Sequence, residues 1–210
     1  MSDGCAKMKR LVDGVRVIPV IVIERASDAV PMAKALLEGG MRVLEVTLRS
    51  AAALPAIEAM ARALPDAIVG AGTVLNRDDA SRARAAGAAF AVSPGYTREL
   101  GAACAELGLP LLPGAATATE VMTALDGGYD FLKFFPAEAS GGIAMLKSLG
   151  GPFPGVAFCP TGGVSSGNLE NYLALANVTC VGGSWLTPPD LVRRGDWAAV
   201  TALCRSAGRR

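Results

Sequence analysis

Apolar runs recur roughly every 20–26 residues along the chain, and each is followed by a longer segment rich in alanine and leucine with charges at helical spacing. Eight of these runs are predicted to be strands, over residues 17–23, 42–48, 68–72, 90–94, 110–113, 131–135, 156–160 and 178–181. Strands that alternate with helices in this order form a parallel sheet. The pattern therefore predicts an α/β fold.

Eight strand–helix units predict, more specifically, a closed (β/α)8 barrel of the TIM type that forms a single domain over residues 1–210. Residues 1–16 precede the first strand and are expected to be an N-terminal extension with a short helix covering the bottom of the barrel. A doubly wound sheet is the alternative. It is disfavoured because it needs fewer strands and usually a GxGxxG turn, whereas the candidate glycine clusters lie late in this chain.

The predicted helices carry start signals. Ser27 is expected to cap a helix over residues 28–38, and Asn76 is expected to cap a helix over residues 77–86. Thr117 and Glu120 have the spacing of a capping box. These signals support helices between the predicted strands.

The composition removes several classes of function. Hydrophobic residues make up 51% of the chain and charged residues 19%, so the chain can bury a sizeable core. The net charge of +1 gives no basis for a nucleic-acid or anionic-membrane partner. The chain has no histidine, which excludes nucleophiles activated by histidine and zinc sites that contain it. We expect neither a metal nor a cofactor.

Cysteine usage and the N-terminal pattern bear on the compartment. The five cysteines are an odd number, widely spaced and without a CxxC pair, which is typical of a reduced, cytoplasmic protein. The apolar run at 17–23 is followed by Glu24 and Arg25, so a strand is favoured over a signal peptide. No run approaches the ~18 apolar residues of a membrane span, and no membrane partner is expected.

Catalytic residues of such barrels lie at the carboxyl ends of the strands. In the run 131–135, alternation places Lys133 on the inner face with Phe131 and Phe135. Burial beside aromatic rings favours the neutral amine, a nucleophile that forms an imine with a carbonyl substrate. A lysine that reaches solvent or pairs with an acid is the structural alternative. The other four lysines lie in segments typical of solvated helix surface.

The same alternation in the run 42–48 and the residue after it places Glu45, Thr47 and Arg49 inside the barrel. Some pairing is required, because an isolated buried charge is very costly, and both a Glu45–Arg49 and a Glu45–Lys133 ion pair are open. A carboxylate beside an imine is also placed to move protons on and off the neighbouring carbon. Arg49 offers a planar fork suited to a substrate carboxylate.

Glycines end the last two predicted strands, in Thr161-Gly162-Gly163 and Gly183-Ser184. Barrels commonly build a phosphate site there from backbone N–H groups, which glycine lets a ligand approach closely. Ordinary turns are the structural alternative for glycine pairs. Thr161 can hydrogen-bond a carboxylate or hydroxyl, although threonine at a helix entry is often just a cap.

Several motifs together resemble the family of 2-keto-3-deoxy-6-phosphogluconate (KDPG) aldolase and 4-hydroxy-2-oxoglutarate (KHG) aldolase. These motifs are Pro19-Val20-Ile21-Val22, Glu45-Val46-Thr47-Leu48-Arg49, Gly70-Ala71-Gly72-Thr73-Val74-Leu75, Phe134-Phe135-Pro136-Ala137-Glu138, Phe158-Cys159-Pro160-Thr161-Gly162-Gly163 and Gly182-Gly183-Ser184-Trp185. The resemblance implies a class I, metal-independent lyase of the Entner–Doudoroff pathway. Such an enzyme splits the phosphorylated keto acid into pyruvate and glyceraldehyde 3-phosphate. It also implies cleavage of 4-hydroxy-2-oxoglutarate to pyruvate and glyoxylate, and a homotrimer.

The resemblance also implies roles for residues. Lys133 matches the lysine that forms the Schiff base, and Glu45 matches the proton-transfer residue. The implied substrate-binding set is Arg49, Thr73, Pro94, Phe135, Thr161, Gly162, Gly163, Gly183 and Ser184. Arg49 and Thr73 would contact the pyruvate carboxylate, and the set from Thr161 onward would hold the distal hydroxyl and phosphate.

Two other readings remain open on the sequence. An aldolase for the C4-epimeric, galactonate-derived substrate would share the lysine and the glutamate. A phosphate-sugar isomerase, or a phosphate-binding barrel without catalysis, would use Lys133 only structurally. Reduction of a pyruvate imine with borohydride separates the last two from an aldolase.

Overall fold

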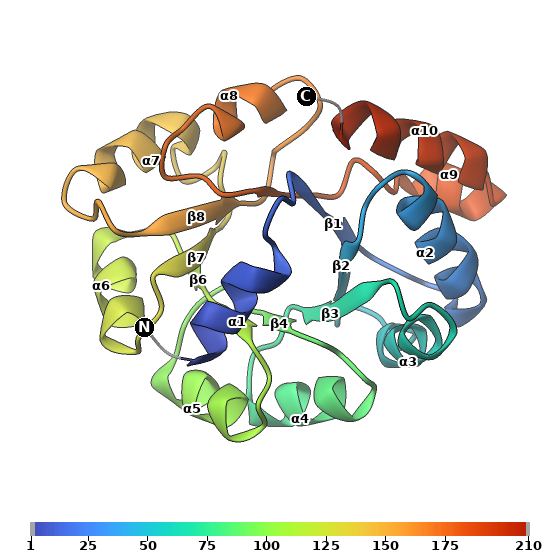
Figure 1. The fold of residues 1–210 in the computed structure, drawn as a ribbon, viewed down its shortest axis with the longest axis horizontal. Helices are drawn as coiled ribbons and strands as arrows, with labels where there is room; N and C mark the ends of the chain where they lie inside the picture. The colour runs from blue at the N-terminus through green and yellow to red at the C-terminus, as the bar shows by residue number, and fades with distance from the viewer. Residues whose placement is uncertain (1–2, 209–210) are drawn as a thin grey trace.

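The structure is a computed structural model that describes residues 3–208. Short strands alternate with helices along these residues (Figure 1). The strands are β1 (Val17–Ile21), β2 (Val43–Thr47), β3 (Ile68–Gly72), β4 (Ala91–Val92), β5 (Leu111–Leu112), β6 (Gly114–Ala115), β7 (Phe131–Phe134), β8 (Ala157–Pro160) and β9 (Val181–Gly183). The helices are α1 (Asp3–Leu11), η1 (Ala26–Asp28), α2 (Ala29–Glu38), α3 (Ala53–Ala63), α4 (Arg77–Ala85), α5 (Arg98–Glu106), α6 (Ala118–Asp126), α7 (Gly142–Gly150), α8 (Leu169–Leu173), α9 (Pro189–Arg194) and α10 (Trp197–Gly208).

All pairings between these strands are parallel, and the strands form two sheets. One sheet has the order β5-β4-β3-β2-β1-β9, and the other has the order β6-β7-β8. Helices surround the strands (Figure 1). The predicted α/β fold with parallel strands is confirmed.

Pro113 marks the junction between the two sheets. It alone separates β5, which pairs with β4, from β6, which pairs with β7. Proline has no N–H to give to a ladder, so it suits a position where a strand changes neighbour. Its carbonyl still accepts a bond of 2.8 Å from the N–H of Lys133. The predicted strand at 110–113 is therefore two short strands, and the second was not foreseen.

The N-terminal helix α1 crosses one end of the strands (Figure 1). Cys5 and Met8 on its inner side are buried. The Cys5 thiol donates to the carboxylate of Asp130 at 3.1 Å, and Lys9 pairs with the same carboxylate at 2.8 Å. Because Asp130 directly precedes β7, α1 covers the amino ends of the strands, as the sequence predicts. The carboxyl ends lie at the opposite side.

Two of the three predicted helix caps are confirmed. The Asn76 side chain accepts from the N–H of Asp79 at 2.9 Å, and Thr117 and Glu120 form the capping box. The cap at Ser27 is wrong, since Ser27 lies inside η1 and α2 starts after Asp28 without a side-chain cap bond. A single 3-10 turn that runs directly into the helix removes the need for that cap.

The predicted last strand at 178–181 is also misplaced. Only Val178 makes an isolated bridge there, to Phe158, and the regular strand is β9 at Val181–Gly183. Its two glycines have low intrinsic strand preference. They are held in the sheet by pairing with Ile18 and Pro19 of β1.

The core is apolar and includes several cysteines. The rings of Phe134 and Phe158 pack edge to face, with centroids 6.3 Å apart. Cys159 is also buried in this core. Burial raises the pKa of the Cys104 and Cys204 thiols to about 11, so both stay protonated at neutral pH.

Candidate active site

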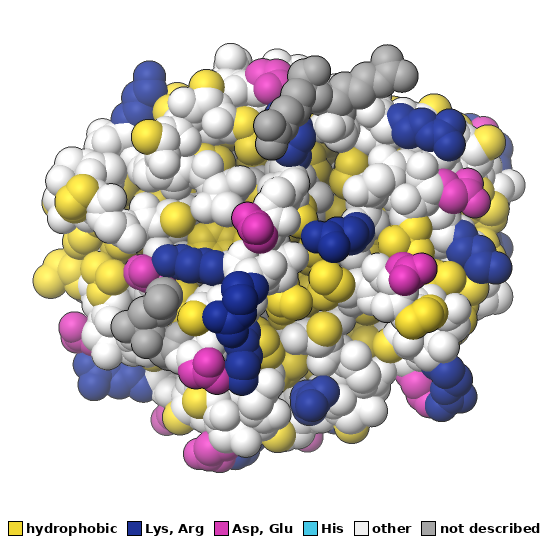
Figure 2. Space-filling view, in the orientation of Figure 1, with side chains coloured by type: hydrophobic (Ala, Val, Ile, Leu, Met, Phe, Trp, Pro, Cys, Tyr) yellow, Lys and Arg dark blue, Asp and Glu magenta, His cyan; other side chains and the backbone are white. Residues whose placement is uncertain are grey.

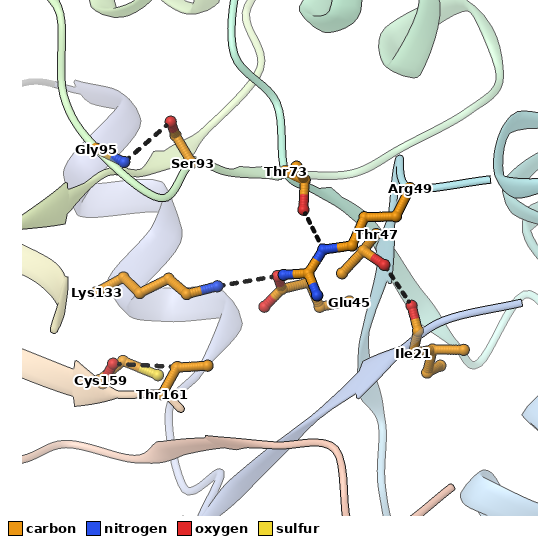
Figure 3. A network of polar contacts seen from close by, with 10 residues as sticks. All are labelled: Ile21, Glu45, Thr47, Arg49, Thr73, Ser93, Gly95, Lys133, Cys159 and Thr161. Carbon is orange, nitrogen blue, oxygen red and sulfur yellow. Dashed lines mark hydrogen bonds and ion pairs between the residues drawn. The ribbon is translucent and has the colours of Figure 1, made fainter. Parts of the chain in front are cut away.

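Lys133 and Glu45 form an ion pair inside the molecule. The Nζ atom of Lys133 on β7 lies 3.2 Å from Oε1 of Glu45 on β2, and each side chain is less than 5% exposed. The two side chains point toward each other from different sheets (Figure 3). This selects the Glu45–Lys133 pairing over the Glu45–Arg49 pairing. The other lysines are exposed or half-buried, so the predicted contrast between them and Lys133 is confirmed.

An aromatic ring also borders the amine. The Nζ atom of Lys133 lies 5.2 Å from the ring centre of Phe135. Phe131, on the same alternation, is buried. The inward, aromatic setting predicted for Lys133 is confirmed, and it is the setting in which a lysine loses hydration.

Gly72 makes room for the Glu45 carboxylate. A Cβ atom added at Gly72 would lie 2.2 Å from Oε1 of Glu45 and 2.8 Å from its Cδ. No side chain can occupy that space unless the carboxylate moves. Glycine at the end of β3 is therefore part of what aims Glu45 at Lys133.

Arg49 and Thr73 meet just beyond the ends of β2 and β3. Nε of Arg49 donates to Oγ1 of Thr73 at 3.2 Å (Figure 3). Thr73 has φ of 58°, a left-handed conformation that is unusual for a β-branched residue. Within the described residues no other hydrogen bond uses the Arg49 side chain, so the donors of its two terminal nitrogens are unpaired. Arg49 is exposed and Thr73 is half-buried.

Two buried polar residues near these strands were not singled out as site residues from the sequence. The hydroxyl of Thr47 donates to the carbonyl of Ile21 at 2.9 Å, which ties β2 to β1 (Figure 3). Ser93 is 3% exposed and accepts weakly, at 3.4 Å, from the N–H of Gly95, which follows Pro94. A hydroxyl at a strand end was the available signal for Ser93.

The glycines after β8 and in β9 are explained partly by packing. An added Cβ at Gly163 would lie 2.4 Å from Cγ of Glu138, and one at Gly183 would lie 1.9 Å from the Trp185 ring. Thr161 forms an isolated parallel β-bridge with Gly182. A Cβ atom added at Gly182 would lie 2.2 Å from Oγ1 of Thr161. Close packing therefore requires glycine at these positions whether or not a ligand binds.

The backbone of the same segment nevertheless presents donors. Gly162 has φ of 99° and Gly163 has φ of 80°, and both lie at the surface or half-buried. Within residues 3–208, no hydrogen bond uses the N–H groups of Gly162, Gly163 or Ser184. Consecutive unpaired N–H groups in such a turn are a common cradle for an anion.

A cavity of about 320 Å³ opens beside these strand ends, of a size common for small-molecule sites. Its wall joins Arg49 to Ser184 and continues over Val20, Val22, Arg25 and Thr187. Lys133 and Glu45 do not line it, so the cavity lies beside the ion pair. Apart from Ser184, the lining residues after β1 and β9 were not singled out as site residues from the sequence, since only their position after strand ends marked them.

No group of three or more Cys, Asp or Glu side chains in residues 3–208 is arranged to hold a metal ion. None of the helices there is long and apolar enough to cross a membrane. The surface seen in Figure 2 mixes basic and acidic side chains among apolar ones.

A buried lysine–carboxylate pair inside a parallel α/β fold is an arrangement in which a lysine can act as a nucleophile. The family model described as "Aldolase: KDPG and KHG aldolase" matches residues 8–203. The chain belongs to this family and is an aldolase, an enzyme of the lyase class.

Similar proteins agree with that membership. The 2-dehydro-3-deoxy-phosphogluconate aldolase of Pseudoalteromonas atlantica is 54% identical over 91% of this chain and 89% of its own. The structure of KDPG aldolase from Legionella pneumophila, with pyruvate captured at low pH as a covalent carbinolamine intermediate, is 51% identical. It has a TM-score of 0.89 and covers 91% of this chain and 93% of its own.

The structure of the Zymomonas mobilis ZM4 enzyme with 3-phosphoglycerate is 46% identical, with a TM-score of 0.90 and 96% coverage of both chains. A native KDPGal structure is less similar, at 30% identity and a TM-score of 0.78 over 91% of this chain and 95% of its own. The chain is therefore more similar in sequence and structure to these two KDPG aldolases than to the KDPGal protein.

Proposed function

We propose that the protein cleaves 2-dehydro-3-deoxy-6-phosphogluconate into pyruvate and glyceraldehyde 3-phosphate, through an imine between the substrate and Lys133. It also cleaves 4-hydroxy-2-oxoglutarate into pyruvate and glyoxylate. The observation that carries this proposal is the buried contact of 3.2 Å between Lys133 and Glu45. A nucleophilic amine and a carboxylate that can exchange protons with it are both within reach of one substrate carbonyl.

Imine formation is the first part of the reaction. The Lys133 ammonium gives a proton to Glu45, and the neutral amine attacks the C2 carbonyl of the substrate. Glu45 then returns this proton to the hydroxyl of the resulting carbinolamine. The hydroxyl leaves as water, which gives a protonated imine and leaves Glu45 as a carboxylate again. This cation draws electrons from the neighbouring C3–C4 bond, so the chain supplies its electron sink covalently.

Carbon–carbon cleavage follows with Glu45 as the base. Its carboxylate takes the proton of the C4 hydroxyl, the C3–C4 bond breaks, and the aldehyde leaves. The electron pair forms an enamine on the pyruvate half. Glu45 then returns the proton to C3, and water releases pyruvate and the free amine of Lys133.

The pyruvate half is held by residues after β2 and β3. The free terminal nitrogens of Arg49 bind the substrate carboxylate as a fork, and Thr73, which receives the Nε bond, holds that fork in place. Pro94 and Phe135 complete the wall around the reacting carbons. Phe135 supports this role by lying beside the Lys133 amine.

The distal half of the substrate is held at the ends of β8 and β9. The unpaired N–H groups of Gly162, Gly163 and Ser184 and the Ser184 hydroxyl bind the phosphate. Gly183 lets the chain pass closely there, and Thr161 contacts the distal hydroxyls. This proposal is supported by the open N–H groups and by the cavity that reaches Ser184.

The architecture is proposed to be a closed eight-stranded (β/α)8 barrel in a single domain over 1–210, with residues 1–16 as its extension. Two observations support closure. Pro113 alone separates the two sheets on one side, and the bridge between Thr161 and Gly182 joins β8 to β9 on the other.

We also propose a homotrimer. Exposed Met122 and Leu125, three residues apart on α6, offer one apolar contact for it.

The compartment proposed is the cytoplasm. It is supported by Cys104, Cys159, Cys180 and Cys204, which remain thiols in the described chain although all are buried. A reducing compartment keeps such residues in this state.

The test is retro-aldol activity on the two substrates and on the C4-epimeric phosphorylated acid, each coupled to pyruvate formation. We expect turnover of the first two and much slower turnover of the epimer. Faster turnover of the epimer would assign the galactonate-derived substrate instead. No pyruvate from any of the three would contradict the proposed function.

A further inference from the structure

The turn formed by residues 161–163, called the glycine turn here, is held through all three of its carbonyl groups. The carbonyl of Thr161 accepts from the N–H of Ala137 at 2.8 Å, and that of Gly162 accepts from the N–H of Glu138 at 3.0 Å. The carbonyl of Gly163 accepts from Nδ2 of Asn168 at 3.1 Å. Each peptide plane in the turn is therefore fixed by a donor outside it.

Fixed carbonyls determine where the N–H groups point. In a trans peptide the C=O of one residue and the N–H of the next are antiparallel. The N–H groups of Gly162, Gly163 and Val164 therefore each point away from the donor that holds the preceding carbonyl. None of these N–H groups has a hydrogen-bond partner within residues 3–208.

The Glu138 side chain adds a second hold on the turn. Its methylene carbons fill the space where a side chain at Gly163 would lie. A Cβ atom added at Gly163 would lie 2.4 Å from Cγ of Glu138 and 2.6 Å from Cβ of Glu138. Its Oε1 accepts from the hydroxyl of Tyr172 on α8. Tyr172 is fully buried, and burial together with the Glu138 carboxylate raises the pKa of its hydroxyl. The Tyr172 hydroxyl is therefore protonated at neutral pH and donates to Glu138.

We propose that Glu138, Tyr172 and Asn168 form a brace that sets the preference of the enzyme for phosphorylated over unphosphorylated substrates. They are positioning residues. They hold the glycine turn so that its N–H groups meet the phosphate, and they contact no reacting atom. This inference rests on the phosphate end of the proposed function.

The brace also ties the phosphate end to the reacting centre. Ala137 and Glu138 lie just after β7, the strand that carries Lys133, and are separated from it by Phe135 and Pro136. A displacement of the glycine turn relative to β7 would change the distance between the bound phosphate and the imine carbon. Binding energy from the phosphate can position the reacting carbons only if that distance is held.

Charge makes Tyr172 important beyond geometry. The Glu138 carboxylate packs against the turn that is proposed to receive a dianion, and like charges repel. The Tyr172 hydroxyl holds one of its oxygens toward α8. Without that hydroxyl the carboxylate is free to turn toward the phosphate, so both orientation and charge would disfavour the phosphorylated substrate.

The experiment compares Tyr172→Phe with Tyr129→Phe, a matched loss of a hydroxyl from a buried tyrosine before β7, at the other end of the strands. Steady-state kinetics are measured on 2-dehydro-3-deoxy-6-phosphogluconate and on 4-hydroxy-2-oxoglutarate. For Tyr172→Phe we expect kcat/KM to fall about 10-fold on the first, mainly through KM, and less than about twofold on the second. The Tyr129→Phe variant should leave the ratio of the two values unchanged.

Two further variants keep the test decisive if Tyr172→Phe folds poorly. Asn168→Ala should shift the ratio in the same direction, whereas Asn177→Ala, which removes a similar amide bond to the carbonyl of Leu146, should not. Glu138→Gln keeps the acceptor for Tyr172 and removes the charge, so it should retain the wild-type preference or strengthen it.

Equal losses on both substrates in folded Tyr172→Phe and Asn168→Ala variants would overturn the brace. Loss of all activity in Glu138→Gln would also overturn it, because Glu138 would then act in the chemistry itself. A wild-type enzyme that makes no pyruvate from either substrate would instead contradict the proposed function, so the two failures are distinguishable.

Discussion

The two halves of the proposed active site, the pyruvate half and the phosphate half, are built from different parts of the chain. The pyruvate half, at β2, β3 and β7, depends on side chains, with Lys133 and Glu45 paired at 3.2 Å and Arg49 bonded to Thr73 at 3.2 Å. The phosphate half, after β8 and in β9, depends on backbone N–H groups whose orientation is set by neighbouring loops. The first half is sensitive to the identity of single side chains, and the second to whatever holds the peptide planes.

This difference separates deletion of chemistry from loss of geometry. Removing a nucleophile or a base stops a step in the reaction for every substrate. Moving an N–H cradle affects only the substrate that carries the phosphate. The ratio of activities on the two substrates therefore reports which half a substitution has damaged.

Lys133→Ala should give the largest effect, a loss of at least roughly 10³-fold on both substrates, because no imine can form. The ion pair between Lys133 and Glu45 also predicts a loss of stability in this variant. Glu45 would be left as a buried carboxylate without its partner, which costs about 3–5 kcal/mol. Pyruvate formation and urea denaturation measure the two effects. The double variant Lys133→Ala/Glu45→Gln should recover stability without activity, and substantial turnover by any folded variant lacking Lys133 would exclude the imine.

Glu45→Gln should lower turnover on both substrates by about 10²–10⁴-fold, the usual value of general acid–base help. The amide keeps the shape of the side chain but cannot take the proton from the C4 hydroxyl. The readouts are kcat and the exchange of pyruvate C3 protons with deuterated solvent. Near-normal exchange in this variant would show that Glu45 serves only as the ion-pair partner of Lys133.

Gly72→Ala should reduce activity on both substrates by roughly 10²-fold, because the added Cβ would displace the Glu45 carboxylate. Gly155→Ala is the matched control, since an added Cβ there meets nothing within 4 Å. Steady-state rates of the two variants, with circular dichroism to confirm folding, test this. Full activity of Gly72→Ala would mean that the position of Glu45 is not critical.

Ser184→Ala should act on one substrate only, because it removes a hydroxyl from the phosphate half. We expect kcat/KM to fall about fivefold on the phosphorylated acid and to stay nearly constant on 4-hydroxy-2-oxoglutarate. Ser148→Ala, on α7, is the control, as its hydroxyl donates only to the carbonyl of Ala144 at 3.0 Å. An equal fall on both substrates would place Ser184 at the pyruvate half. Gly163→Val is not suited to this test, because it would clash with Glu138.

Dialysis against EDTA should have the smallest effect, namely none on either substrate. In the proposed mechanism the imine takes the electrons that a metal would otherwise take. Rates before and after dialysis are the measurement, with added divalent ions as the control. Activity that is lost on dialysis and restored by a divalent ion would point to a metal-dependent aldolase.

The sequence predicted the pyruvate half better than the phosphate half. The pyruvate half depends on side chains, whereas the phosphate half depends on the orientation of backbone N–H groups. Alternation along a strand fixes which side chains face inward, and it correctly placed Lys133 and Glu45 inside. It did not decide between Arg49 and Lys133 as partner of Glu45, because that depends on the distance between β2 and β7. Gly72 gave no signal, since the need for space arises only when β2 and β3 pair.

The misplaced elements have related physical causes. The strand β9 contains Gly182 and Gly183, whose own preference does not favour a strand, and pairing with β1 determines it. The brace of Glu138, Tyr172 and Asn168 joins three segments separated along the chain. Contacts of this kind follow from tertiary packing and leave no local pattern in the sequence.

The most direct measurement is reduction with borohydride in the presence of pyruvate, followed by peptide mass spectrometry. The proposed imine mechanism predicts a reduced pyruvate adduct on Lys133 and on none of the exposed lysines. It predicts no adduct in Lys133→Ala. The adduct should still form in Ser184→Ala and Tyr172→Phe, whose pyruvate half is intact. An active enzyme that gives no adduct on Lys133, or an adduct on another lysine, would contradict the proposal that Lys133 forms the imine.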